Sequence, residues 1–452
     1  SSYMSKSTLE NFNIQMRLKL QGIGAALRFD DGYTVVEEII PGGATDRAKA
    51  LQPKDKIIAV QQQGQKPVDI IDMNLRDVVK MIRGAKGTPV MLTVLRGGAS
   101  TERKVVTIVR DKVNLEDQAA KLTYDTRKIG NRKVKLAVID LPSFYGDASL
   151  KERSSYADIR KLIERAKRAK ADGLLLDLSR NGGGLLDEAV RISGLFIHKG
   201  GVVAVKNAKQ KVDILEDQNE ELLYGGPFVI LTSRLSASAS EILAGAMKDY
   251  KRAVIVGDDQ TFGKGTVQAV INLPPTLGAL KVTTSMFFLP GGESTQRQGV
   301  HSDVVVPSPF STDEFGERAL PNNLPEQAIA PFVYQDSSSH MDKDWTPVST
   351  DLVSRLSEKS AKRVASSDEF KKIQEQLKKA QENKGIVRLA DVLKEQADAK
   401  KTKKPELTRK EKEDKERGPE FKEALNILAD MVTDSAPLAS DKNANTAAKS
   451  PN

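Results

Sequence analysis

The chain has 452 residues, of which 39% are hydrophobic and 29% charged, with three histidines and no cysteine. The lack of cysteine excludes a disulfide framework and thiolate chemistry, and the scattered histidines do not suggest a metal site. The net charge of +9 favours anionic surfaces such as a membrane or envelope polymers, whereas no recognition motif indicates nucleic-acid binding. The length predicts about two or three domains.

The first 19 residues are mixed and polar, and four apolar side chains alternate with polar ones near their end. These are Phe12, Ile14, Met16 and Leu18. The alternation predicts a strand. No signal peptide and no bilayer-spanning run is visible, and the opening S-S-Y-M-S-K-S-T is expected of an excised or processed chain.

Residues 20–112 contain a glycine loop followed by alternating strands and helices. The loop consists of Gly22, Ile23, Gly24 and Ala25, and an amphipathic helix follows at 75–84. A G-x-G segment alone predicts only a tight turn, but the whole order resembles a PDZ domain. In such a domain a peptide adds a strand to an open sheet edge, and its terminal carboxylate binds N–H groups of the loop. The resemblance implies that these four residues bind substrate tails, although alanine replaces the commoner phenylalanine at the fourth position.

From residue 113 to 309 strands alternate with helices, which predicts an α/β core. V-K-L-A-V-I-D-L and G-L-L-L-D-L are typical of strands, and a charged helix lies between them. The G-G-G turn at 182–184 opens another helix, without the lysine and serine or threonine of a phosphate-binding loop. Segments 267–273 and 279–289 predict an antiparallel hairpin.

Ser236, Ser238 and Ser240 alternate with alanine before a helical pattern, and Lys264 follows the next strand between two glycines. A serine hydroxyl becomes a good nucleophile when a neighbouring base takes its proton. A lysine can be that base only if burial lowers its pKa from about 10.4. The pattern therefore allows a Ser–Lys pair with an oxyanion site at the helix N-terminus, but it also fits simple helix capping and a glycine turn.

A histidine-based triad is a weaker interpretation. His301 precedes Asp303 by two residues, yet a loop histidine explains this spacing without any catalytic role.

Four motifs in order resemble the C-terminal processing proteases, also called tail-specific proteases, of peptidase family S41. They are L-D-L-S-R-N-G-G-G-L-L-D-E-A-V, S-A-S-A-S-E-I, T-F-G-K-G-T-V-Q and G-G-E-S-T-Q-R-Q-G-V. The similarity runs from about Leu20 to Pro307. It implies a crotonase-like α/β serine protease core at 113–309 with an inserted PDZ domain at 20–112, a remnant of a longer N-terminal region at 1–19, and no cofactor or metal.

The resemblance also implies the roles of individual residues. By position, Ser238 is the nucleophile, Lys264 is the general base and Gln268 orients the lysine. The N–H groups of Gly183 and Ala239 stabilise the oxyanion. Asp249 matches an acidic position that supports the site.

Residues 310–452 correspond to a helical, charged C-terminal extension. Helices are expected from about residue 351, and the mixed-charge run at 400–417 has no apolar face and is expected to be solvated or disordered. Residues 419–432 predict a short amphipathic helix that docks on the core, and the remaining tail is expected to be flexible.

These features predict a serine endopeptidase that selects protein and peptide substrates by apolar C-terminal tails. The resemblance places it in the periplasm, allows association with the inner membrane, and allows an envelope adaptor protein as a partner. Two other classes of protein stay open. One is a non-catalytic PDZ adaptor that only binds C-termini, and the other is an acyl-transfer enzyme on a crotonase-like core, which would require a thioester substrate.

Overall fold

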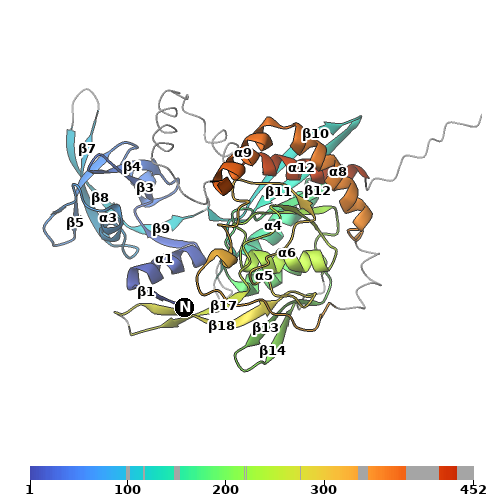
Figure 1. Ribbon diagram of the computed structural model, residues 1–452. Coiled ribbons are helices and arrows are strands. Elements are labelled where there is room, and N and C mark those ends of the chain that lie inside the picture. The colour runs from blue at the N-terminus through green and yellow to red at the C-terminus, as the bar shows by residue number, and fades with distance from the viewer. Residues whose placement is uncertain are drawn as a thin grey trace, which may run out of the picture.

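The computed structural model describes residues 1–97, 102–115, 118–146, 153–217, 219, 221–274, 276–333, 345–382 and 417–434. Their strands form a core sheet, a second sheet beside it, a separate sheet in an N-terminal domain, and a two-stranded ribbon that joins this domain to the core (Figure 1).

The core sheet is parallel except at one edge. Its order is β10 (Lys121–Ile129), β11 (Arg132–Asp140), β12 (Gly173–Asp177), β15 (Phe228–Thr232), β16 (Val254–Gly257) and β19 (Val304–Val305). Only β10 pairs antiparallel. Leu174 and Leu176 pack in one hydrophobic cluster and Leu175 in the other, because successive strand residues face opposite sides. The sheet is thus buried on both faces, and the predicted α/β core is confirmed.

Helices cover both faces of this sheet. On one side lie α4 (Ser155–Arg168), α5 (Leu186–Ser193) and α6 (Ala239–Asp249), and on the other lie α8 (Thr350–Ser366), α9 (Asp368–Glu382) and α12 (Pro419–Asp434). Ser154 caps α4 by accepting the Ala157 N–H, and one face of this helix is buried, with Ile159, Leu162, Ile163 and Ala166.

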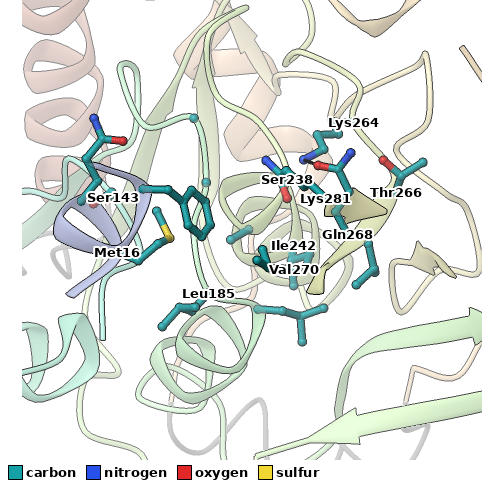
Figure 2. Close-up of a pocket in the computed structure, with 18 of the residues that line it drawn as sticks. Met16, Ser143, Leu185, Ser238, Ile242, Lys264, Thr266, Gln268, Val270 and Lys281 are labelled. Atoms are coloured by element: carbon teal, nitrogen blue, oxygen red, sulfur yellow. Dashed lines mark hydrogen bonds between the residues drawn. The ribbon is translucent and has the colours of Figure 1, made fainter. Parts of the chain in front are cut away.

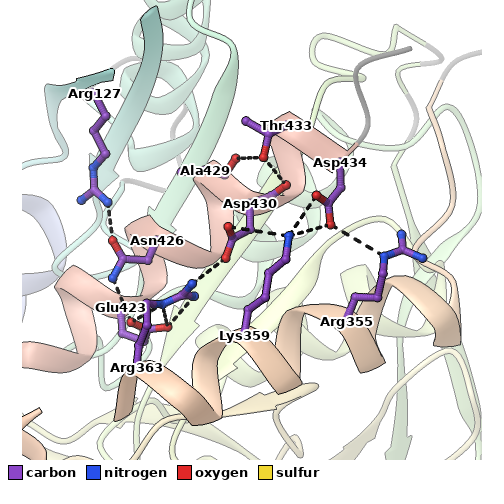
Figure 3. Close-up of polar contacts among 10 residues, drawn as sticks. All are labelled: Arg127, Arg355, Lys359, Arg363, Glu423, Asn426, Ala429, Asp430, Thr433 and Asp434. Atoms are coloured by element: carbon purple, nitrogen blue, oxygen red, sulfur yellow. Dashed lines mark hydrogen bonds and ion pairs between the residues drawn. The ribbon is translucent and has the colours of Figure 1, made fainter. Parts of the chain in front are cut away.

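Helix α12 is an integral part of the core, which confirms the predicted docking. It packs across β11, β12, β15 and β16, and a Cβ placed on Gly173 would lie 2.9 Å from side-chain atoms of Leu428 and Val432. Ion pairs tie α8 to α12: Arg363 contacts the buried Glu423 and also Asp430, at 2.8 Å each (Figure 3). The C-terminal helices therefore form the third layer of the core.

Replacing Leu428 with alanine is expected to lower the free energy of unfolding of the core by about 2–5 kcal/mol, because Leu428 is fully buried between α12 and the sheet. The single tryptophan, Trp345, is buried in the main core cluster and reports unfolding by fluorescence in urea. Leu277→Ala is the matched control, since this side chain is 52% exposed, and it should leave the midpoint nearly unchanged. Equal midpoints for the two variants would contradict the integral role of α12.

The second sheet brings the start of the chain to the core. β1 (Ser2–Met4) pairs with β18 (Ala279–Phe288), which also pairs with β13 (Gly201–Asn207) and β17 (Thr266–Asn272), and β14 (Val212–Glu216) pairs with β13. The predicted hairpin is β17–β18. Because β1 precedes the N-terminal domain and pairs with β18, that domain is inserted within the core.

The N-terminal domain has the predicted PDZ-like order. Its sheet runs β3 (Ala25–Asp30), β4 (Tyr33–Ile39), β5 (Lys56–Gln62), β7 (Pro89–Arg96) and β8 (Glu102–Val109), with β6 (Val68–Asp69) beside β5. Helices α2 (Ala44–Ala48) and α3 (Leu75–Ile82) complete it, and β2 (Lys19–Gly22) and β9 (Asp111–Asn114) form the connecting ribbon. Strand β3 lies at the sheet edge next to α3.

The predicted strand near Phe12 is wrong: residues Lys6–Arg17 form helix α1. The side chain of Ser5 accepts the Thr8 N–H and caps the helix. Phe12 and Met16 are four residues apart, so a helix places them on one face, where both line a cavity of the core. The alternation of apolar residues was misleading because α1 packs no side chain fully into a core, so its apolar residues need not follow the spacing of a buried helix face.

Residues 400–416 of the charged run and the tail at 435–452 lie outside the described residues. In a short 3-10 helix, η2 (Glu317–Ala319), the Glu317 N–H donates to Phe262 O at 2.8 Å. No helix within the described ranges is long and apolar enough to cross a membrane.

Candidate active site

Ser238 lies at a strained turn between the core sheet and α6. Strand β15 delivers the chain to this turn, and Ser238 has a φ of 59°, in the region that a non-glycine residue rarely adopts. Ala239 is the first residue of α6, so its N–H belongs to the unpaired donors of a helix N-terminus. The turn therefore places a hydroxyl beside N–H groups that can bind a developing negative charge.

Lys264 lines the same cavity as Ser238 and lies on the loop between β16 and β17. The cavity measures about 630 Å³, and Figure 2 shows Ser238, Lys264 and Gln268 together on one side of it. Lys264 Nζ donates to Gln268 Oε1 at 3.3 Å. Burial lowers the pKa of the Lys264 ammonium, and the charge of Lys281 lowers it further, whereas Glu317 and Glu241 raise it. The net decrease in pKa favours the neutral amine that a general base requires.

Glu241 joins the segments that carry Ser238 and Lys264, and sequence analysis gave it no role. Its Oε2 accepts the N–H of Ser238 at 2.7 Å and of Lys264 at 2.9 Å. Its Oε1 accepts the Gly263 N–H at 2.7 Å and the Thr261 hydroxyl at 2.6 Å. Burial raises the pKa of Glu241 to about 7, although all four hydrogen bonds oppose this increase. The only signal in the sequence was a glutamate three residues after a helix cap.

Gly183 lies directly against the nucleophile turn. Its φ is +107°, and a Cβ there would approach Ala237 O to 2.8 Å, so no larger residue fits without movement. The Gly183 N–H donates to Asn181 Oδ1 at 2.8 Å. Asn181 is fully buried, and its backbone oxygen accepts the Ser240 hydroxyl at 2.8 Å. The expected oxyanion donor is therefore near Ser238 but bonded to Asn181 in this structure.

Asp249 lies away from the cavity that Ser238 and Lys264 line. It is the last residue of α6, roughly 16 Å along the helix from Ser238 at 1.5 Å per residue. Its carboxylate accepts the Gly291 N–H at 2.7 Å, and burial raises its pKa. The contact fixes the loop after β18, which suits a structural rather than a chemical role.

The glycine loop of the N-terminal domain lies between β2 and β3. Gly24 has a φ of +76°, and a Cβ there would lie 2.9 Å from Gly43 Cα. The oxygen of Ile23 accepts the Thr45 N–H at 2.8 Å, and the Ile23 side chain shares a buried cluster with Val78 and Ile82 of α3. Together with Gly22 and Ala25 on either side, the loop forms a fixed turn that leads into β3, next to α3.

His301 has no triad geometry. Asp303 accepts the Ile255 N–H at 2.8 Å and pairs with Lys248 at 3.1 Å, so its carboxylate is used in the core. No group of three or more histidine, aspartate or glutamate side chains suited to a metal occurs in the described part of the chain.

Comparisons with known proteins match the three regions separately. Residues 135–306 match the model of Peptidase family S41, residues 11–95 match the PDZ domain, and residues 310–433 match the C-terminal domain of tail specific protease. The Tail-specific protease of Haemophilus influenzae is 39% identical over 387 residues, 84% of this chain and 53% of that protein. A probable CtpA-like serine protease of Staphylococcus aureus N315 is 32% identical over 68% of this chain and 57% of its own length.

Among solved structures, the PDZ domain of a carboxy-terminal protease from Vibrio cholerae, in complex with a peptide, is 44% identical. The match covers 22% of this chain and 99% of that one, with a TM-score of 0.21. The chain spans about half the length of the curated relatives it matches.

Proposed function

Because the chain belongs to the tail-specific proteases of peptidase family S41, we propose that it is a serine endopeptidase that cleaves proteins selected by their C-terminal tails. The observation that carries this proposal is the shared cavity of Ser238 and Lys264. The matches to Peptidase family S41 and to the C-terminal domain of tail specific protease favour hydrolysis over acyl transfer from a thioester.

The proposed chemistry starts with Lys264 as a neutral amine. Lys264 takes the proton of the Ser238 hydroxyl as its Oγ attacks a substrate carbonyl carbon. The protonated lysine then gives this proton to the leaving amine, and an acyl-enzyme remains. Water attacks the ester with Lys264 again as base, which releases the second product and restores Ser238. No cofactor takes part in these steps. Gln268 holds the Lys264 side chain through the 3.3 Å contact.

The oxyanion is proposed to form against the Ala239 N–H at the start of α6 and the Gly183 N–H. Because the Gly183 N–H is bonded to Asn181, it must turn away from that side chain before it can contribute. Substrate binding in the cavity would supply the energy for this change, since a backbone N–H bonds a negative oxygen more strongly than a neutral amide.

The glycine loop is proposed to bind the substrate tail. An extended peptide can pair with the free edge of β3, with its carboxylate at Gly22–Ala25 and its apolar side chains toward α3.

Replacing Gly24 with alanine is expected to weaken tail binding about tenfold or more, because the left-handed φ and the contact with Gly43 both resist a Cβ. Binding is measured by fluorescence anisotropy of a labelled peptide with an apolar C-terminus. Gly64→Ala is the matched control: Gly64 has a φ of +74° in the same domain, and a Cβ there would meet nothing within 4 Å. Similar losses in both variants would mean that backbone strain in the domain, rather than the loop, limits binding.

The test of the proposed function uses an unstructured protein with an apolar C-terminus and a copy that ends in charged residues. We expect the chain to cleave the first much faster than the second, and Ser238→Ala to cleave neither. Binding of apolar tails without any cleavage would favour the PDZ adaptor, and equal cleavage of both copies would remove the tail selection from the proposal.

We propose that the activity lies in the periplasm, as the resemblance to the tail-specific protease family implies. The charge suits peripheral contact with the inner membrane and binding of an envelope adaptor protein. Cell fractionation with detection of the chain tests the compartment, and its presence only in the cytoplasm would contradict this placement.

A further inference from the structure

A second lysine, Lys281, lines the same cavity as Ser238 and Lys264. It lies on β18, where it pairs with Val270 of β17 and Ser2 of β1. Figure 2 shows Lys281 on the side of the cavity that carries Ser238 and Lys264. Of the described residues that line the cavity, none is an aspartate, glutamate or arginine, so the two lysines supply its formal charge.

Three charged side chains act on Lys264 from the surrounding elements: Lys281 from β18, Glu241 from α6 and Glu317 from η2. The oxygens of Glu241 already accept four hydrogen bonds, and Glu317 accepts one from Gln296 at 3.3 Å. Of these three side chains, Lys281 is the one that disfavours a positive charge on Lys264. Two ammonium groups that share a cavity repel each other, and more than in bulk water, because the effective dielectric constant in a protein is lower.

The two lysines have different neighbours. The Lys281 ammonium lies over the Phe12 ring of α1, 5.6 Å from its centroid, and a ring face stabilises a cation. Lys264 instead contacts the neutral oxygen of Gln268, and burial disfavours its charged form. Repulsion between the two lysines is therefore relieved by loss of the proton from Lys264.

We propose that Lys281 is a positioning residue of the Ser–Lys site, whose positive charge in the cavity that it shares with Lys264 favours the neutral form of the base. This inference rests on the proposed protease function, and it assigns roles to β18 and to the Phe12 side of α1. Lys281 would thus tune the basicity of Lys264 without touching the reacting atoms.

The experiment measures kcat/KM against pH for the full chain on one unstructured substrate with an apolar tail. In Lys281→Met, Lys264 should hold its proton more tightly, so the rate at pH 7 should fall about five- to tenfold and recover as the pH rises. Lys281→Arg should keep the wild-type profile, and Lys281→Glu should shift it further toward high pH. The control is Lys206→Met: Lys206 lies on neighbouring β13, 5.3 Å from the centroid of the Phe288 ring, and does not line the cavity.

A second measurement reports the protonation state of Lys264 directly. The rate of its acetylation by acetic anhydride, followed by mass spectrometry at several pH values in a Ser238→Ala background, reports the fraction of neutral amine. Slower acetylation at pH 7 in the Lys281→Met form supports the proposal even if no substrate is cleaved, in which case only the protease function would fail. Acetylation and pH profiles that stay unchanged in Lys281→Met, or a loss of rate equal at every pH, would overturn it.

Discussion

Replacing Lys264 with methionine is expected to lower kcat for cleavage of an apolar-tailed substrate by about 10²–10⁴-fold. Methionine fills a similar volume but cannot accept the Ser238 proton. Because burial and Lys281 lower the pKa of Lys264, the wild-type rate should rise with pH and level off below the pKa of a solvated lysine, about 10.4. The residual activity of the variant should lack this dependence. Both results come from initial rates across a pH series.

The control for this experiment is Lys248→Met. Lys248 lies on α6, the helix that follows Ser238, but its ammonium pairs with Asp303 at 3.1 Å, away from the cavity. The control should keep the wild-type pH profile. If Lys264→Met cleaves as fast as the control, another group serves as the base and the Ser–Lys mechanism is wrong.

Replacing Glu241 with alanine is expected to reduce kcat by more than about 100-fold and the free energy of unfolding by at least about 3 kcal/mol. The substitution would leave three backbone N–H groups and the Thr261 hydroxyl without their acceptor in a fully buried place. It would also remove the link that sets the distance between Ser238 and Lys264. Glu241→Gln keeps the volume but turns one acceptor into a donor that faces N–H groups, so it should recover part of the stability and little activity.

The effect of Glu241 on stability must be separated from its effect on the site. Glu188 is the matched control, because it is also a buried carboxylate, and it accepts the Ser155 hydroxyl at 2.9 Å and the Tyr156 N–H at 2.7 Å. Neither of these partners lines the active-site cavity. At a temperature where Trp345 fluorescence shows both variants folded, Glu188→Ala should keep kcat and Glu241→Ala should not. Equal kcat values would reduce Glu241 to a purely structural residue.

Several elements of the fold were predictable because their signals are local. The buried strand at Gly173–Asp177 is a continuous apolar run, and α4 combines a serine cap with apolar residues at helical spacing. The β17–β18 hairpin was equally visible in two apolar runs joined by a short turn segment. The exception was α1, whose alternating apolar residues predicted a strand. Its apolar face lines the active-site cavity instead of a sheet, and nothing in the segment itself indicates that partner.

The candidate site was predicted in part. Ser238, Lys264 and Gln268 were placed together from motifs, and the structure brings these three to one cavity. Asp249 lies at the far end of α6 from Ser238, because this helix begins at Ala239 and ends at Asp249. The direction of the Gly183 N–H could not be predicted, because the Asn181 side chain two residues away competes for it.

By itself, the sequence determined the order of strands and helices after α1, the residue types of a Ser–Lys site and the PDZ-like domain, because periodicity, caps and glycine turns act over a few residues. The tertiary structure alone decided which charges meet. Glu241 bonds both active segments, and Lys281 of the second sheet lines the same cavity as Lys264. Burial and electrostatic energies depend on distances between segments far apart in sequence, and folding alone sets those distances.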